Sequence, residues 1–118
     1  MTETQFKHKV ENWLDDTNAW FIKYWAGAKF TKEGIPDILA CIDGTFYGIE
    51  LKTTDGRPTL LQLINLKKIR EAGGIGILLY PEEFIHFQDY VETPSQISEY
   101  WYKGNIMLQR SWIEKLNK

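Results

Sequence analysis

Apolar and polar residues follow a helical period at the start of the chain. Between Thr2 and Asp16 the apolar residues recur at the i, i+4, i+7, i+8 spacing of a helix that buries one face. Thr2 and Gln5 have the spacing of a capping box, which places the start of the helix there. The aromatic, β-prone segment 19–25 follows and is predicted to form a strand.

The next two segments have the pattern of a β-hairpin. The apolar runs 37–42 and 45–52 flank the dipeptide Asp43-Gly44, and Asp-Gly between two such runs is the strongest short-range hairpin signal. Both faces of this hairpin are largely apolar, which predicts central strands covered on both sides. Cys41 lies inside the first run and is expected to be a buried structural thiol.

A helix and a further strand follow the hairpin. Residues 59–72 are predicted to form a helix that ends at Gly73-Gly74, and the apolar segment 75–80 forms a strand that Pro81 stops. A strand–helix–strand connection implies that this last strand lies parallel to the strand 45–52. The predicted fold class is therefore α/β, with the order α-β-β-β-α-β, a mixed central sheet and helices on both faces.

The pattern weakens after Pro81. Residues 82–91 are expected to be irregular or to form a short helix. Thr93 and Gln96 have the spacing of a second capping box, which predicts a helix starting there. A short strand over 105–109 and a last helix capped by Ser111 complete the predicted elements.

Composition narrows the class of protein. With 118 residues, 43% apolar and 25% charged, the chain suits one globular domain and excludes a disordered one. It contains no apolar run of the ~20 residues that a membrane span needs and no signal-peptide pattern at its start. We therefore expect a cytoplasmic protein without a membrane partner.

The net charge of −2 is not typical of a nucleic-acid-binding domain. However, residues 71–102 hold six acidic residues and no Lys or Arg, so most basic residues precede them and a one-sided basic face is possible.

Three charged residues share one face of the predicted hairpin. If Asp43-Gly44 is the turn, Asp37 lies opposite Glu50, and Lys52 joins them because residues two apart share a face. Opposed carboxylates repel each other, and partial burial strengthens the repulsion. A lysine offsets one charge, whereas Mg²⁺ bound between the carboxylates offsets both. A metal ion beside an ammonium group suits the hydrolysis of a phosphodiester.

The same residues resemble a known nuclease motif. Pro36-Asp37 followed by Glu50-Leu51-Lys52 resembles the PD-(D/E)XK superfamily, which implies a restriction-endonuclease-like core. The resemblance is closer to its VRR-NUC family, whose small stand-alone members are common in bacteriophages. It covers about residues 3–80 of a single nuclease domain, 1–118, and leaves about 81–118 as a C-terminal helical extension. The residues that carry the closer resemblance are Gly34-Ile35-Pro36-Asp37, Ile49-Glu50-Leu51-Lys52-Thr53, Gly56, Gln62 and Ala72-Gly73-Gly74.

The resemblance implies a role for each of these polar residues. Asp37 and Glu50 would coordinate Mg²⁺ or Mn²⁺, together with the backbone carbonyl of Leu51. Lys52 would position the attacking water. Gln62 would reach back toward the metal from the start of its helix and complete the catalytic set.

Several of these assignments have alternatives. A carboxylate of the first helix often completes the site in this family, and Glu3 matches better than Glu11. Gln62 also has the spacing of a capping box with Thr59, and both roles can coexist. Asp37, which follows a proline, could form a local side-chain–backbone turn, and the other two charged residues could lie on the solvated face of an edge strand.

The leading hypothesis is a Mg²⁺- or Mn²⁺-dependent endonuclease that hydrolyses DNA. The resemblance further implies structure-selective cutting of branched DNA, and a homodimer, because cutting two strands takes two sites. The alternative is a catalytically silent module that binds DNA or another protein in a phage replication or recombination complex, in which case the location is the host cytoplasm. A structural subunit with the same fold would leave the opposed carboxylates unexplained. Phosphate contacts, which fix position without reading sequence, are expected from Lys29, Lys32, Arg57, Lys67 and Lys68.

Overall fold

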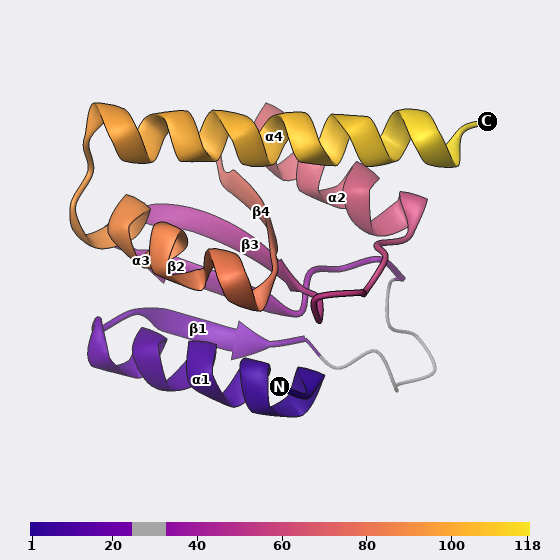
Figure 1. The fold of residues 1–118 in the computed structure, drawn as a ribbon. Coiled ribbons are helices and arrows are strands. Elements are labelled where there is room, and N and C mark those ends of the chain that lie inside the picture. The colour runs from indigo at the N-terminus through magenta and orange to yellow at the C-terminus, as the bar shows by residue number, and fades with distance from the viewer. Residues whose placement is uncertain (25–32) are drawn as a thin grey trace.

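The computed structural model describes residues 1–24 and 33–118. The order of the elements up to β4 is α-β-β-β-α-β, which confirms the predicted core. Three further helical segments follow it (Figure 1). The elements are α1 (Glu3–Asp16), β1 (Trp20–Lys23), β2 (Ile38–Ile42), β3 (Thr45–Leu51), α2 (Leu60–Glu71), β4 (Ile75–Leu79), the short 3₁₀ helix η1 (Pro81–Glu83), α3 (Phe84–Glu92) and α4 (Gln96–Leu116).

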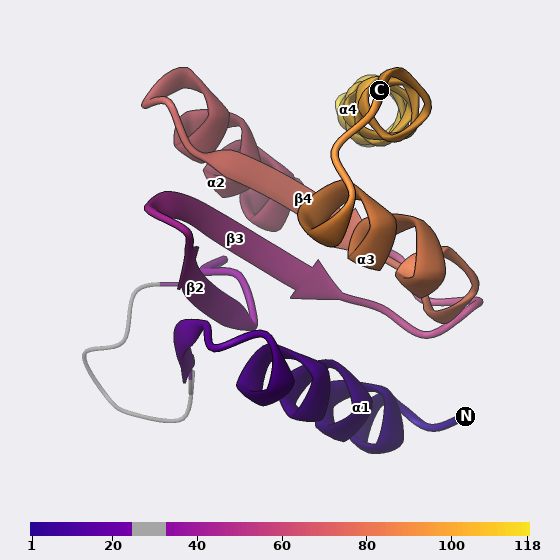
Figure 2. The ribbon, with the colours of Figure 1, turned by 90° about the vertical axis from the view of Figure 1, so that its left-hand side faces the viewer.

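The strands form one mixed sheet in the order β1-β2-β3-β4. The first two pairs are antiparallel, and β3 pairs with β4 in parallel, as the strand–helix–strand connection predicts. Figure 2 shows β3 between α1 on one side and α2 on the other. Helix α4 lies beside β4 and α2, on the far side of the molecule from α1 (Figures 1 and 2). The predicted mixed sheet with helices on both faces is confirmed.

The turn of the hairpin sets the register of the site. Asp43 and Gly44 have φ angles of 49° and 80°, the left-handed geometry that a two-residue type I′ turn requires. Ile42 therefore pairs with Thr45, and the ladder runs without a bulge to the pair Ile38–Ile49. This is the register that the sequence predicts.

Two apolar clusters hold the layers together. In the first, α1 and α3 pack against one face of the sheet, where the ring of Trp13 meets those of Phe84 and Phe87 edge-on at 5.7 and 5.5 Å between centroids. In the second, Leu63 and Leu66 of α2 pack with residues of β4 and α4. The C-terminal helices therefore contribute to both clusters.

Helix α2 lies unusually close to the sheet at one point. A Cβ atom added to Gly76 would stand 2.6 Å from the carbonyl oxygen of Leu66, so only glycine fits there. Ile69, one turn further on, lies over Gly48 of β3. Gln62, one turn before Leu66, continues the same sheet-facing stripe toward the end of β3 where Glu50 lies.

The prediction that both faces of the hairpin are covered is wrong for β2. Helix α2 packs on β3 and β4, and residues of β2 on the same face are left open to solvent. Cys41 is exposed, not buried, and Phe46 beside it is 45% exposed. The sequence could not reveal this, because an apolar run does not say how wide a helix layer will be.

The prediction for the C-terminal segment is also wrong. Instead of a strand over 105–109 and a separate last helix, α4 is one helix of 21 residues, and its capping box uses Ser95 and Ser98, not Thr93. Neither α4 nor any other helix among the described residues is both long enough and apolar enough to cross a membrane.

Two buried polar side chains explain why this segment did not read as a helix. Asn105 accepts a hydrogen bond from the backbone N–H of Leu78 and donates one to its carbonyl, at 3.1 and 2.8 Å. Gln109, one turn later, donates to the carbonyl of Gly76 at 2.9 Å. These amides form hydrogen bonds with backbone groups at the outer edge of β4, where no further strand pairs. Without such partners an exposed strand edge would be open to pairing with another chain.

Replacing Asn105 with alanine should therefore destabilise the protein. The change leaves the buried N–H and C=O of Leu78 without partners, and each such group costs about 1–3 kcal/mol. We expect the free energy of unfolding in urea to fall by about 2–4 kcal/mol. Asn12→Ala, the same change at an exposed site in α1, controls for the higher helix propensity of alanine and should not destabilise. Equal stabilities of the two variants would contradict the edge-capping role.

Candidate active site

Three charged side chains converge at the open end of the β2–β3 hairpin. Asp37 directly precedes β2, Glu50 lies near the end of β3, and Lys52 directly follows it. The ladder ends at Ile38–Ile49, so Asp37 and Glu50 occupy the next opposed positions. The Nζ atom of Lys52 is 3.5 Å from Oε2 of Glu50. The geometry that the hairpin turn predicts is thus present, whereas the catalytic roles stay predictions.

Glu50 is the most constrained member of the group. Its side chain is almost fully buried, with 2% of the residue exposed. The pKa of its carboxyl is raised from 4.5 to about 8, first by burial and then by the charge of Asp37, while the ammonium of Lys52 opposes the shift. When protonated, Glu50 can share its proton with Asp37; Oε1 receives no hydrogen bond from any described residue. A buried carboxylate oxygen without a donor is costly and indicates a missing partner.

Asp37 is held by two other groups. Its Oδ2 atom accepts a hydrogen bond from the backbone N–H of Leu51 at 2.8 Å, which ties the start of β2 to the end of β3. Its Oδ1 atom lies 3.5 Å from Nζ of Lys7 in α1. The local-turn alternative is therefore not what the structure shows, because both partners of Asp37 are distant in sequence.

A cavity of about 330 Å³ opens between Asp37, α1 and β1. Glu11 lines it together with Lys7 and pairs with Lys23 at 3.2 Å. Glu3, which the family resemblance favours, is exposed in the first turn of α1. Of the two carboxylates, Glu11 is the one that shares a cavity with Asp37. Lys7 was missed in the sequence, although its i, i+4 spacing to Glu11 next to the core positions of α1 is a usable signal; Glu11 was named there as the weaker alternative to Glu3.

Gln62 has the capping role that competed with its catalytic one. Its side-chain oxygen accepts the backbone N–H of Thr59 at 2.9 Å, and its own N–H donates to the hydroxyl of Thr59 at 3.2 Å. This reciprocal box starts α2 at the end of the loop that follows Lys52. A contact between Gln62 and the carboxylates stays a prediction.

The donor set fits a hard divalent cation. Asp37 and Glu50 offer carboxylate oxygens from opposed strands, and Glu50 has one buried oxygen in need of a positively charged partner. Mg²⁺ and Mn²⁺ favour such oxygen ligands and complete their coordination with carbonyls and water. Outside residues 25–32, no group of three or more His, Cys, Asp and Glu side chains is placed to hold a metal, so a cation here would rely on two carboxylates with the carbonyl of Leu51 and water.

The predicted phosphate contacts are spread around α2. Arg57 is exposed in the loop before the helix, and Lys67 and Lys68 are exposed on it. Lys29 and Lys32 lie outside the described residues. Contacts of Arg57, Lys67 and Lys68 with DNA stay a prediction.

Comparison with solved structures identifies the fold. A structure of a VRR_NUC domain superposes with a TM-score of 0.61, covering 79% of this chain and 97% of that one at 18% identity. This chain has the restriction-endonuclease-like fold of a VRR_NUC domain. A structure of Hjc, a Holliday junction resolvase of Archaeoglobus fulgidus, matches 66% of this chain and 69% of its own at 26% identity and a TM-score of 0.45. No family model and no curated protein matches the sequence.

The VRR_NUC-like fold agrees with the motif from which the resemblance was drawn. The superposition spans nearly the whole of the other domain. At 18% identity the likeness establishes the fold alone. Function must therefore be argued from Asp37, Glu50 and Lys52 themselves.

Proposed function

We propose that this protein is a metal-dependent endonuclease that hydrolyses phosphodiester bonds in DNA. The observation that carries the proposal is the buried Glu50, whose Oε1 atom lacks a donor while Asp37 and Lys52 stand beside it. A strongly raised pKa at a site with specific charged neighbours is typical of functional residues. The VRR_NUC-like fold supports the same reaction class.

Asp37, Glu50 and the carbonyl of Leu51 would hold Mg²⁺ or Mn²⁺. When bound, such an ion lowers the pKa of a water ligand and stabilises negative charge on phosphate oxygens. Leu51 fixes the carboxylate of Asp37 through its backbone N–H, so the two ligand strands cannot shift independently.

Lys52 would act on the attacking water. Its side chain is only 15% exposed, and its ammonium lies 3.5 Å from Oε2 of Glu50, which holds it in place. From there it can donate a hydrogen bond to the water and support the charge that develops on the phosphate. Gln62 would contribute from the start of α2 through its amide nitrogen, since its oxygen serves the helix cap.

Cleavage assays with a panel of substrates test the proposal. Linear, nicked, flap and four-way-junction DNA, together with RNA, should be incubated with Mg²⁺, Mn²⁺ or EDTA. We expect at least one DNA form to be cut with either metal and none with EDTA. A preference for the junction would support structure-selective cutting. Cleavage at the wild-type rate by the Glu50→Gln protein would show that the cutting does not come from the Asp37–Glu50 site, and failure to cut any substrate would refute the activity.

We also propose that the protein acts as a homodimer. Light scattering of the free protein and of its complex with junction DNA measures the molar mass and so tests this. If the protein binds DNA but never cuts it, the catalytically silent binding module becomes the better description.

A further inference from the structure

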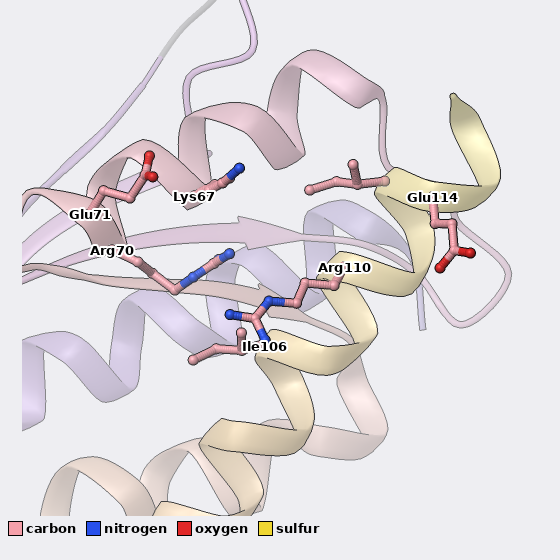
Figure 3. Close-up of a pocket in the computed structure, with 7 residues that line it drawn as sticks. Lys67, Arg70, Glu71, Ile106, Arg110 and Glu114 are labelled. Carbon is pink, nitrogen blue, oxygen red and sulfur yellow. The ribbon is translucent and has the colours of Figure 1, made fainter. Parts of the chain in front are cut away.

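A second concave site lies between α2 and α4. It is a cavity of about 590 Å³ that none of Asp37, Glu50 and Lys52 lines. Figure 3 shows its walls, to which both helices contribute. The lining residues are Lys67, Arg70 and Glu71 from α2, and Ile106, Arg110, Ile113 and Glu114 from α4.

Three cationic groups gather in this cleft. The nitrogen-bearing ends of Lys67, Arg70 and Arg110 point into the space between the helices, and Glu71 and Glu114 lie on either side of them (Figure 3). Among the described residues, no carboxylate lies within ion-pair distance of any of the three. Like charges gathered in a concave site without a counter-ion favour an anionic ligand.

Arg70 is the cation of the group that a hydrogen bond holds in place. It is half-buried, and its guanidinium donates a hydrogen bond to Oε1 of Gln109, the side chain that also serves the edge of β4. Burial, and then the charge of Arg110, lowers its pKa, against the opposing effects of Tyr102 and Glu71. A planar guanidinium fixed in this way is pre-organised for the fork-like recognition of phosphate oxygens.

We propose that Lys67, Arg70 and Arg110 bind a backbone phosphate of the DNA that is cut at the Asp37–Glu50 site, an inference that rests on the proposed function. The cleft carries three cationic and two anionic side chains, so its net charge of +1 matches the single charge of a phosphodiester better than the double charge of free phosphate. The proposed phosphate contact lies in the cleft between α2 and α4. Helix α4 follows the α-β-β-β-α-β core in the chain.

The position along α2 agrees with one strand reaching both sites. The helix begins at Leu60, after the short loop that follows Lys52, and Lys67 and Arg70 lie seven and ten residues further on. At 1.5 Å per residue this is about 10–15 Å. Successive phosphates of one strand are about 3.4 Å apart along the axis of the duplex. The offset along α2 therefore corresponds to about three or four nucleotides of one strand.

DNA binding measured without cleavage tests the assignment. The affinity for a fluorescent duplex should be measured by anisotropy in EDTA over a range of salt concentrations. Lys67→Ala with Arg110→Ala removes two exposed cations of the cleft while leaving the Arg70–Gln109 bond in place. The matched control is Lys115→Ala, which removes a charge from α4 outside the cleft, above the ring of Trp112. A urea titration of each variant checks that it is folded; if the double variant is not, Arg110→Ala alone replaces it.

The expected result is a specific loss of salt dependence. Losing one phosphate contact should reduce the slope of log K against log salt by about 0.9, with affinity about tenfold weaker at low salt, whereas Lys115→Ala should match the wild type. Equal slopes for the double variant and the control would overturn the proposal. So would sub-millimolar binding of inorganic phosphate that needs Arg110 while DNA binding does not.

The outcome is separable from that of the proposed activity. If no DNA is cut with Mg²⁺ but binding depends on the cleft, the nuclease activity fails and the phosphate contact stands. If cutting depends on Glu50 while the double variant binds DNA normally, the activity stands and the phosphate contact fails.

Discussion

Replacing Glu50 with glutamine should abolish cleavage and at the same time stabilise the metal-free protein at alkaline pH. The substitution keeps the shape of the side chain but removes the negative charge that a cation needs. We expect the rate of DNA cleavage to fall by about a thousandfold, the upper end of the scale seen when a preorganised electrostatic group is lost. Binding of Mn²⁺, measured by calorimetry, should weaken in parallel.

The stability effect follows from the raised pKa of Glu50. In the folded metal-free protein this carboxyl keeps its proton up to about pH 8, whereas in the unfolded chain it loses it near pH 4.5. Between these values the folded state binds the extra proton, so the free energy of unfolding falls as pH rises, by up to about 1.4 kcal/mol per pH unit. Glutamine does not titrate and has no such loss.

Urea titrations in EDTA from pH 5 to pH 9 measure this difference. The two proteins should have similar stability at pH 5, and the variant should become progressively more stable up to about pH 8. Other titrating groups cancel in the comparison because both proteins carry them. Parallel curves for wild type and variant across this range would show that Glu50 ionises in the folded protein without an energetic penalty. That result would contradict the raised pKa of its buried carboxyl.

The core of the site could be derived from the sequence because one short turn determines it. Asp43-Gly44 permits only a tight two-residue turn, and counting back from it places Asp37 opposite Glu50. A period of two then places Lys52 on the same face. The residues of the hairpin alone were sufficient to predict this arrangement, because all three charged side chains lie on or next to its two strands.

The different burial of the two carboxylates could not be derived in this way. The sequence treats Asp37 and Glu50 as equivalent partners in repulsion. In the structure Asp37 gains Lys7 and the N–H of Leu51, whereas Glu50 is almost fully buried and its pKa is raised first by that burial. Which carboxylate is desolvated depends on how the helices pack, and that is a property of the whole fold.

The C-terminal segment shows the same limit in a different form. Buried polar residues such as Asn105 and Gln109 disguise a helical face, because apolar periodicity assumes that what is buried is apolar. Their side chains are buried since they complete the edge of β4. The cleft that α4 forms with α2 was missed for the same reason, and with it the positions of Arg70 and Arg110.

Lys52→Ala should remove most of the activity by a route that differs from that of Glu50→Gln. The ammonium of Lys52 lowers the pKa of Glu50, so its loss should raise that pKa further and weaken Mn²⁺ binding at neutral pH, where the ligand must first lose its proton. This part of the defect should shrink at pH 9 and disappear once Mn²⁺ saturates the site, because the bound cation holds Glu50 in its ionised form. If Lys52 also orients the attacking water, cleavage should stay reduced by about a hundredfold or more at pH 9 with saturating Mn²⁺.

The two roles are separated by measuring Mn²⁺ affinity and the cleavage rate at pH 7 and pH 9 in the same preparations. The control is Lys9→Ala, which removes an exposed cation of α1 that lies above the ring of Phe84 in α3. It should behave as wild type at both pH values. If alkaline pH and saturating metal restore the cleavage rate of Lys52→Ala, then Lys52 serves to keep Glu50 ionised and the water must be positioned by another group. A persistent loss with normal Mn²⁺ affinity assigns Lys52 to the reacting atoms, because no remaining effect on Glu50 would account for it.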